Sequence, residues 1–138
     1  MTNDTSRFIR WQKIAIDQLG YALNLVLAFT VATLGYWFTL LKDKEFAPGP
    51  SAKCAMLLSL SALLASTISG VVCVLCRLWD FRGTERRAGG HPEAPTRDEL
   101  RGLGRITWRL FYAHLSLFAL GVATLAMALL LTYGGKLT

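Results

Sequence analysis

The stretch CAMLLSLSALLASTISGVVCVLC, from Cys54 to Cys76, contains no Asp, Glu, Lys or Arg. A helix needs about 20 apolar residues to cross the hydrocarbon core of a bilayer. Backbone groups in lipid must be hydrogen-bonded within their own segment, so a run of this kind is helical despite its β-branched residues. The stretch therefore predicts a transmembrane helix in the middle of the chain.

Two similar runs flank it, LGYALNLVLAFTVATLGYWFTLL from Leu19 to Leu41 and LFYAHLSLFALGVATLAMALLLTY from Leu110 to Tyr133. Only 17% of the 138 residues are charged and 53% are hydrophobic, whereas soluble domains carry about 25% charged residues. The first run is longer than the apolar part of a signal peptide, and no small-residue cleavage site follows it. The sequence predicts an all-α integral membrane protein with one membrane domain, residues 1–138, and transmembrane helices at 19–41, 54–76 and 110–133.

The basic residues are divided unequally between the two sides of these spans. Arg7, Arg10 and Lys13 precede the first span, and eight arginines lie between the second and the third. The other four cations are all lysines and lie on the opposite side. Because cytoplasmic segments are enriched in Lys and Arg, we expect the N-terminus and the Arg-rich segment 77–109 in the cytoplasm and the C-terminus outside.

The connecting segments carry their own signals. Residues 6–18 place apolar side chains on one face and cations largely elsewhere, which predicts an amphipathic helix in the inner headgroup layer. RLWDFRGTERRA continues out of the second span, and Thr96 with Glu99 forms a T-x-x-E capping box that predicts the start of a helix. Gly102 and Gly104 are expected to interrupt that helix, either as a loosely ordered joint or as a hinge.

The stretch RDELRGLGRITWR, from Arg97 to Arg109, has arginine at every fourth position, which makes one basic stripe on a helix. Such a stripe can attract anionic lipids and set topology, or it can hold a phosphate-bearing ligand, for which the forked guanidinium suits Arg better than Lys. The candidate phosphate-binding residues are Arg77, Arg82, Arg97, Arg101, Arg105 and Arg109. The aromatic side chains among them, Trp79, Phe81 and Trp108, are candidates for stacking on nucleic-acid bases.

Polar residues inside the spans are few. Asn24 and His114 lie at matched depths, and two interpretations stay open: a hydrogen bond between them, or a place on a water-filled vestibule. The second span carries a stripe of small residues at steps of three and four: Ser59, Ala62, Ser66, Ser69, Gly70 and Cys73. It predicts close helix packing or the lining of a pore. Three helices cannot enclose a water path alone, so a channel requires a homo-oligomer, for which we take a tetramer as the starting hypothesis.

No chemistry of catalysis or metal binding is indicated. The sequence has no glycine-rich phosphate loop, no paired carboxylates in a span and no nucleophile elbow. Cys73 and Cys76 form a C-x-x-C pair with too few nearby ligands for zinc. We therefore predict no enzyme activity, no metal and no cofactor.

The block RLWDFRGTERRA, together with GRITWRLFYAHLSLFALG and YALNLVLAF, resembles a group of small bacterial inner-membrane proteins with an RLxDFRxT-type signature. Arg77, Asp80, Phe81 and Arg82 match that signature. The plan of the chain is also similar to the membrane effectors of bacterial anti-phage systems, which act as ligand-gated pores. This resemblance implies a location in the inner membrane and a nucleotide or oligonucleotide ligand made by a partner enzyme.

Two classes of function follow. In the first, the protein is a homo-oligomeric channel or pore-forming effector, gated by an anionic nucleotide or oligonucleotide at its Arg-rich cytoplasmic face. In the second, it is a non-conducting accessory or scaffold subunit of a larger membrane complex. A holin-like lytic protein is a further alternative.

Overall fold

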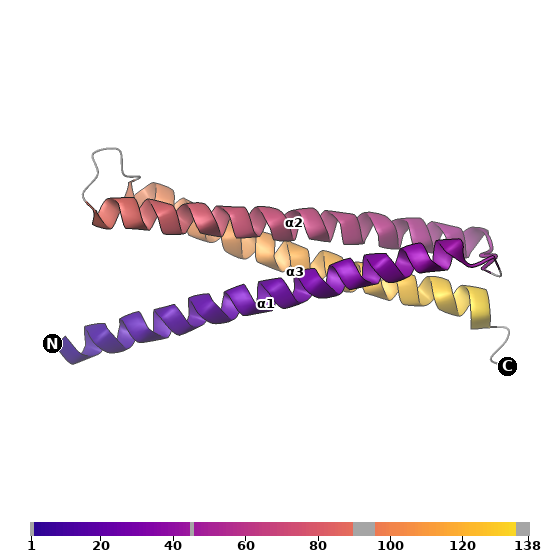
Figure 1. The fold of residues 1–138 in the computed structure, drawn as a ribbon, viewed down its shortest axis with the longest axis horizontal. Helices are drawn as coiled ribbons and strands as arrows, with labels where there is room; N and C mark the ends of the chain where they lie inside the picture. Colours follow the sequence, from indigo (N-terminus) through magenta and orange to yellow (C-terminus); the bar gives the residue numbers. More distant parts are fainter. Residues whose placement is uncertain (1, 45, 90–95, 135–138) are drawn as a thin grey trace.

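The computed structural model describes residues 2–44, 46–89 and 96–134. Three helices follow one another: α1 (Thr2–Lys42), α2 (Pro50–Ala88) and α3 (Arg97–Tyr133) (Figure 1). Each contains a segment that is long and apolar enough to cross a membrane, namely Asp17–Lys42, Pro50–Arg87 and Gly102–Tyr133. The prediction of an all-α chain with three apolar spans is confirmed.

The helix ends follow local chemistry. α2 begins with Pro50, which suits a first turn because its missing N–H group has no partner there in any case. It ends at Ala88, after which the N–H of Gly89 donates to the carbonyl of Glu85 at 3.0 Å. α3 begins directly after Thr96, as the T-x-x-E pattern predicts, although the side chain of Glu99 lies outside the described part of the chain.

Two helices are more continuous than the sequence suggested. α1 runs without a break from Thr2 to Lys42, so residues 6–18 and 19–41 belong to one helix, and the side chains of residues 6–13 lie outside those described. α3 passes through Gly102 and Gly104, so the predicted interruption is wrong. Each glycine costs a helix about 1 kcal/mol relative to alanine, and the unbroken hydrogen bonding of a long helix outweighs that cost.

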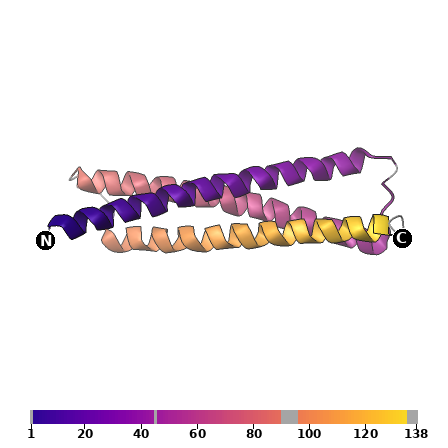
Figure 2. The ribbon, with the colours of Figure 1, turned by 90° about the horizontal axis from the view of Figure 1, so that it is seen from below.

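α2 and α3 form an antiparallel pair that packs along most of its length, and α1 shares far fewer contacts with either of them. The N-terminal end of α1 lies apart from the pair, while its other end approaches it (Figure 1). Seen from below, the three helices still run lengthwise together (Figure 2). Buried positions recur at seven-residue intervals on each helix: Leu23, Thr30 and Trp37; Ser59, Ser66 and Cys73; Thr107, His114, Gly121 and Ala128. This spacing is typical of the knobs-into-holes packing of coiled coils.

The apolar core of the bundle lies toward the predicted outer end. Trp37 and Leu40 of α1, Met56 of α2, and Leu125 and Ala128 of α3 form one buried cluster. The indole Nε1 of Trp37 donates to the backbone carbonyl of Met56 at 3.4 Å. The outer end is therefore where all three helices are packed together.

Candidate functional site

Three polar contacts join α2 to α3 at regular intervals. The hydroxyl of Ser59 donates to the carbonyl of Gly121 at 2.8 Å. Ser66 pairs with His114, and the thiol of Cys73 donates to the carbonyl of Thr107 at 3.3 Å. Each step of seven residues along α2 is matched by a step of seven in the opposite direction along α3. We call these contacts, Ser59 to Gly121, Ser66 to His114 and Cys73 to Thr107, the polar ladder.

The central contact of the polar ladder is reciprocal. Nδ1 of His114 lies 2.7 Å from the backbone carbonyl of Ser66, and the hydroxyl of Ser66 lies 2.9 Å from the carbonyl of His114. A carbonyl oxygen can only accept, so Nδ1 carries a proton and the hydroxyl donates in return. Both side chains are fully buried, and Nε2 of His114 has no hydrogen-bond partner. His114 therefore fixes the register of α2 against α3.

The predicted hydrogen bond between Asn24 and His114 is wrong. Asn24 is exposed on the outer surface of α1. Nδ1 of His114 contacts Ser66 instead. Gly70 lies where the three helices meet, because a side-chain carbon there would lie 2.8 Å from Leu27 of α1 and 3.0 Å from the ring of His114. α1 thus presents Leu27 to this level of the bundle and turns Asn24 away from it.

The small-residue stripe of α2 is used for packing within the chain. Ser59, Ser66 and Cys73 are fully buried, Ala62 is nearly so, and Ser69 is half-buried. At α3, a side-chain carbon on Gly121 would lie 2.7 Å from Cγ of Leu63, so the glycine permits the close approach of the two helices. The hydroxyl groups of Ser59 and Ser66 consequently face α3 and not an open path.

A pocket of about 340 Å³ lies at the opposite end of the bundle from the apolar core. All three helices contribute to its wall, and the side chains are Leu19, Arg77, Asp80, Phe81, Thr84, Gly104, Thr107 and Trp108. We call this the inner pocket, because it lies at the end of the bundle that the sequence predicts to be cytoplasmic. Arg77 comes directly after the apolar run that ends at Cys76, so the pocket lies at the border of the second span.

Among the described residues, Arg77 is the one cation that lines the inner pocket, and its guanidinium reaches from α2 to α1. The guanidinium carbon lies 5.7 Å from the centre of the Phe81 ring, within the range of a cation–π interaction. A side-chain carbon at Gly20 of α1 would lie 2.6 Å from Nη1 of Arg77. Only a glycine leaves room for the guanidinium at this point. The position of Arg77 therefore depends on the packing of α1.

The structure brings together one arginine predicted to bind phosphate and two aromatic residues predicted to stack on bases, and it leaves the other described candidates outside the pocket. Arg77, Phe81 and Trp108 line the inner pocket. Trp79 is 60% exposed and lies on another face of α2. Arg82, Arg105 and Arg109 are exposed and do not line the pocket. The side chains of Arg97 and Arg101 lie outside the described residues.

Sequence reasoning missed the other polar residues of the pocket, although a signal was present. Arg77, Asp80, Phe81 and Thr84 are spaced by three, one and three residues, which places them on one face of a helix. All four line the inner pocket, whereas Leu78, Trp79 and Arg82 of the same motif do not. The face of the RLWDFRGT block that the pocket uses can therefore be read from its spacing. Thr107 and Gly104 of α3 had no such signal.

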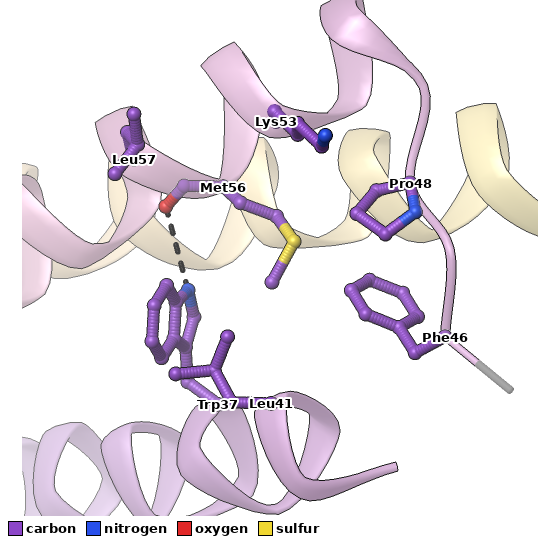
Figure 3. A pocket seen from close by; sticks show the side chains of 7 residues that line it. All are labelled: Trp37, Leu41, Phe46, Pro48, Lys53, Met56 and Leu57. Carbon is purple, nitrogen blue, oxygen red and sulfur yellow. Dashed lines mark hydrogen bonds between the residues drawn. The ribbon is translucent and has the colours of Figure 1, made fainter. Parts of the chain in front are cut away.

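A second pocket, of about 310 Å³, lies at the outer end. Trp37 and Leu41 of α1 face Met56 and Leu57 of α2 across it, and Phe46, Pro48 and Lys53 complete its wall (Figure 3). Lys53 is the one charged side chain among the described residues of its wall. In the described part of the chain, no group of three or more His, Cys, Asp or Glu side chains could hold a metal ion. The inner pocket is the place where charge, aromatic rings and all three helices meet.

Comparison of the chain with protein-family models, with curated proteins and with solved structures finds no match. The class that the structure itself defines is an all-helical protein with three helices long and apolar enough to span a membrane.

Proposed function

We propose that the protein is the subunit of a homo-oligomeric channel in the bacterial inner membrane, controlled by a phosphate-bearing ligand at the inner pocket. In this proposal the N-terminus and segment 77–109 are cytoplasmic and the C-terminus is outside. The observation that carries the proposal is the meeting of Arg77, Phe81 and Trp108 in a pocket that also touches α1. An anionic nucleotide made by a partner enzyme is one such ligand.

The chemistry of the pocket suits a phosphate group. A guanidinium can donate two parallel hydrogen bonds to phosphate oxygens. Arg77 already bridges from α2 toward Gly20 of α1, so a group bound by its guanidinium contacts the junction between the two helices. The rings of Phe81 and Trp108 supply apolar surface in the same wall.

Control of the channel follows from the way α1 is attached. α1 meets the other helices near Gly20, Leu27 and Trp37. Its N-terminal end lies apart from the pair (Figure 1). A ligand that fills the inner pocket contacts Leu19 and adds an attachment at the free end of α1. Ligand binding would then change the tilt of α1 relative to the α2 and α3 pair, as in other hinge-like closures around a ligand.

The ion path in this proposal lies between copies of the chain. The hydroxyl stripe of α2 is buried against α3, so it does not supply the lining. α1 offers a different face: Asn24, Ala28, Gly35 and Thr39 are all exposed, and their spacing places them on the side opposite Leu23, Thr30 and Trp37. Small residues and an amide at membrane depth suit contact with another helix or with water.

The test begins with the purified oligomer in liposomes, where ion flux is measured with and without candidate nucleotides. Arg77→Lys and Arg77→Gln should both lose the response to ligand, because Lys keeps the charge but loses the two-pronged contact. Arg82→Lys and Arg105→Lys are matched controls outside the pocket and should respond like the wild type. Reporter fusions at Gly89 and after Thr138 check the orientation. A strictly monomeric protein that gives no flux would contradict the proposal.

One observation favours a second candidate, a non-conducting accessory subunit. The polar ladder uses the hydroxyl groups of Ser59 and Ser66 inside the chain. The exposed side chains of α2 toward the middle of its apolar run are mostly large and apolar, such as Leu64, Ile68 and Val71. Such a surface suits docking on a larger membrane partner. A ring of identical subunits after purification supports the channel, whereas a monomer that is stable only with other proteins supports the accessory role.

A further inference from the structure

The inner pocket carries charges of both signs on one face of α2. Arg77 and Asp80 lie three residues apart and both line the wall, with the hydroxyl-bearing Thr84 one turn further on. The hydroxyl of Thr84 donates to the carbonyl of Asp80 at 2.8 Å, so this turn of the helix is ordered by a side-chain contact. A ligand in this pocket meets a guanidinium and a carboxylate at once.

This pair of charges favours some phosphate-bearing ligands over others. A ligand that carries only negative charge gains from Arg77 but is repelled by Asp80. A ligand with a phosphate and an ammonium group gains from both, because opposite charges at short range attract each other. The rings of Phe81 and Trp108 in the same wall add a surface on which a cation is attracted to the ring face.

The depth and size of the pocket indicate where such a ligand comes from. Arg77 follows the last apolar residue of the run that ends at Cys76, and a Trp side chain lines the wall, as is usual at the level of lipid headgroups. A volume of about 340 Å³ lies at the small end of the range for ligand pockets, roughly 300 to 1,000 Å³, which fits a headgroup and not an oligonucleotide. The wall belongs to all three helices. The N-terminal end of α1 lies apart from the other two helices (Figure 1).

We propose that the inner pocket binds the headgroup of a phospholipid with a primary ammonium group, its phosphate at Arg77 and its ammonium at Asp80. A primary ammonium has three hydrogen-bond donors for the carboxylate of Asp80 and the hydroxyl of Thr84, whereas a trimethylated ammonium has none. This inference rests on the proposed function in one respect only, the phosphate at Arg77. The lipid would then be the ligand that attaches α1 to α2 and α3.

The test is native mass spectrometry of the purified full-length protein after exchange into defined lipids. The wild type should retain phosphatidylethanolamine in preference to phosphatidylglycerol and phosphatidylcholine, and each added N-methyl group should weaken retention. Equal retention of phosphatidylglycerol, or of the fully methylated lipid, would overturn the inference. This series needs no mutation, so it does not depend on the folding of a variant.

Asp80→Asn then tests the carboxylate itself. The preference for phosphatidylethanolamine over phosphatidylglycerol should fall by about tenfold, the size of a lost hydrogen bond to a charged group. Glu85→Gln is the matched control, because Glu85 is exposed on the same helix and does not line the pocket. An unchanged preference in Asp80→Asn would overturn the inference.

Two competition experiments distinguish binding of the lipid from binding of soluble compounds that carry a phosphate group. Free phosphoethanolamine and adenosine monophosphate are offered to the protein in competition with phosphatidylethanolamine. Retention of the lipid against both supports the proposal, whereas binding of either soluble compound without retention of the lipid would overturn it. Ion flux is recorded on the same samples: lipid selectivity without flux contradicts only the channel, and flux that responds to nucleotide without lipid selectivity contradicts only this inference.

Discussion

The two interfaces of the bundle are built from different chemistry. α2 and α3 are joined by the polar ladder, in which buried side chains donate to backbone carbonyls of the facing helix at three levels. α1 contacts them mainly through buried Leu23, Trp37 and Leu40, with the hydrogen bond from Trp37 to Met56 at its outer end. Lipid supplies little hydrophobic force between helices, so directional bonds and close packing decide register. α2 and α3 therefore form a closely packed pair, called the fixed pair below, to which α1 is attached by fewer contacts.

The largest loss of stability is expected from a larger side chain at Gly121, where α2 and α3 approach each other closely. In Gly121→Val the added atoms meet Leu63, whose backbone nitrogen lies 3.3 Å from the position of a side-chain carbon at residue 121. We expect a loss of about 1 to 3 kcal/mol in the free energy of unfolding, because overpacking forces a helix to move. Steric-trapping measurements in bilayers give this quantity. Gly102→Val is the matched control on α3, since nothing lies within 4 Å of a side-chain carbon there. Equal losses in the two variants would contradict the interface.

Substitutions at the centre of the polar ladder should cause the next largest loss of stability. Ser66→Ala and His114→Leu each remove a member of a reciprocal pair, and we expect losses of about 0.5 to 2 kcal/mol, as for other hydrogen bonds between membrane helices. A double-mutant cycle should show that the two losses are not additive, because both variants break the same contact. Asn24→Leu should leave the stability of the single chain unchanged. Additive losses in the cycle would show that Ser66 and His114 do not act together.

The attachment of α1 should be weaker than the polar ladder. Trp37→Phe keeps an aromatic ring in the core cluster but removes the bond to Met56, which is long at 3.4 Å. We expect a loss of about 0.5 kcal/mol. Hydrogen exchange should rise in α1 while α2 and α3 keep their protection. A rise of equal size in all three helices would contradict the separation of α1 from the fixed pair.

The smallest effect on stability is expected at Gly20. In Gly20→Ala the added methyl group meets only the far end of the flexible Arg77 side chain, so the guanidinium can move away at little cost. The unfolding free energy should change by less than about 0.5 kcal/mol, as for most substitutions that leave the core intact. Retention of phosphatidylethanolamine should nevertheless fall, because Arg77 no longer occupies its place in the inner pocket. Gly35→Ala, with open space around it, is the control and should retain the lipid.

The sequence was sufficient for the number of helices, their spans and their order, because length and hydropathy determine them. It was not sufficient for the rotation of each helix about its axis. Asn24 and His114 have matched depths, yet Asn24 faces outward and His114 meets Ser66. Depth follows from counting residues along one helix, whereas rotation depends on which neighbouring helix packs most closely. Small or polar residues recur every seven positions in the second span and in the third. A comparison of these two repeats would have indicated that α2 pairs with α3.

At the candidate site, too, the sequence indicated a set of candidate residues, and helix packing decides which of them line the pocket. The regular row of arginines on α3 drew attention to Arg105 and Arg109, but both are exposed and outside the pocket. Trp108 lies between them in sequence and turns toward the pocket, since neighbouring residues on a helix point in directions about 100° apart. Arg77 was one candidate among several, and only the packing of α1 near Gly20 separates it from the others.

The attachment of α1 is tested most directly by comparing distances between α1 and α2 at the two ends of α1. Spin labels at Gln18 and Glu85 report on the inner end, and labels at Thr39 and Ser51 report on the outer end, on a background with the three native cysteines replaced by serine. Double electron–electron resonance should give a narrow, unchanged distribution at the outer end. At the inner end it should be broad in phosphatidylglycerol bilayers and should narrow when phosphatidylethanolamine is added. Inner and outer distributions of equal width, both indifferent to the lipid, would contradict the account.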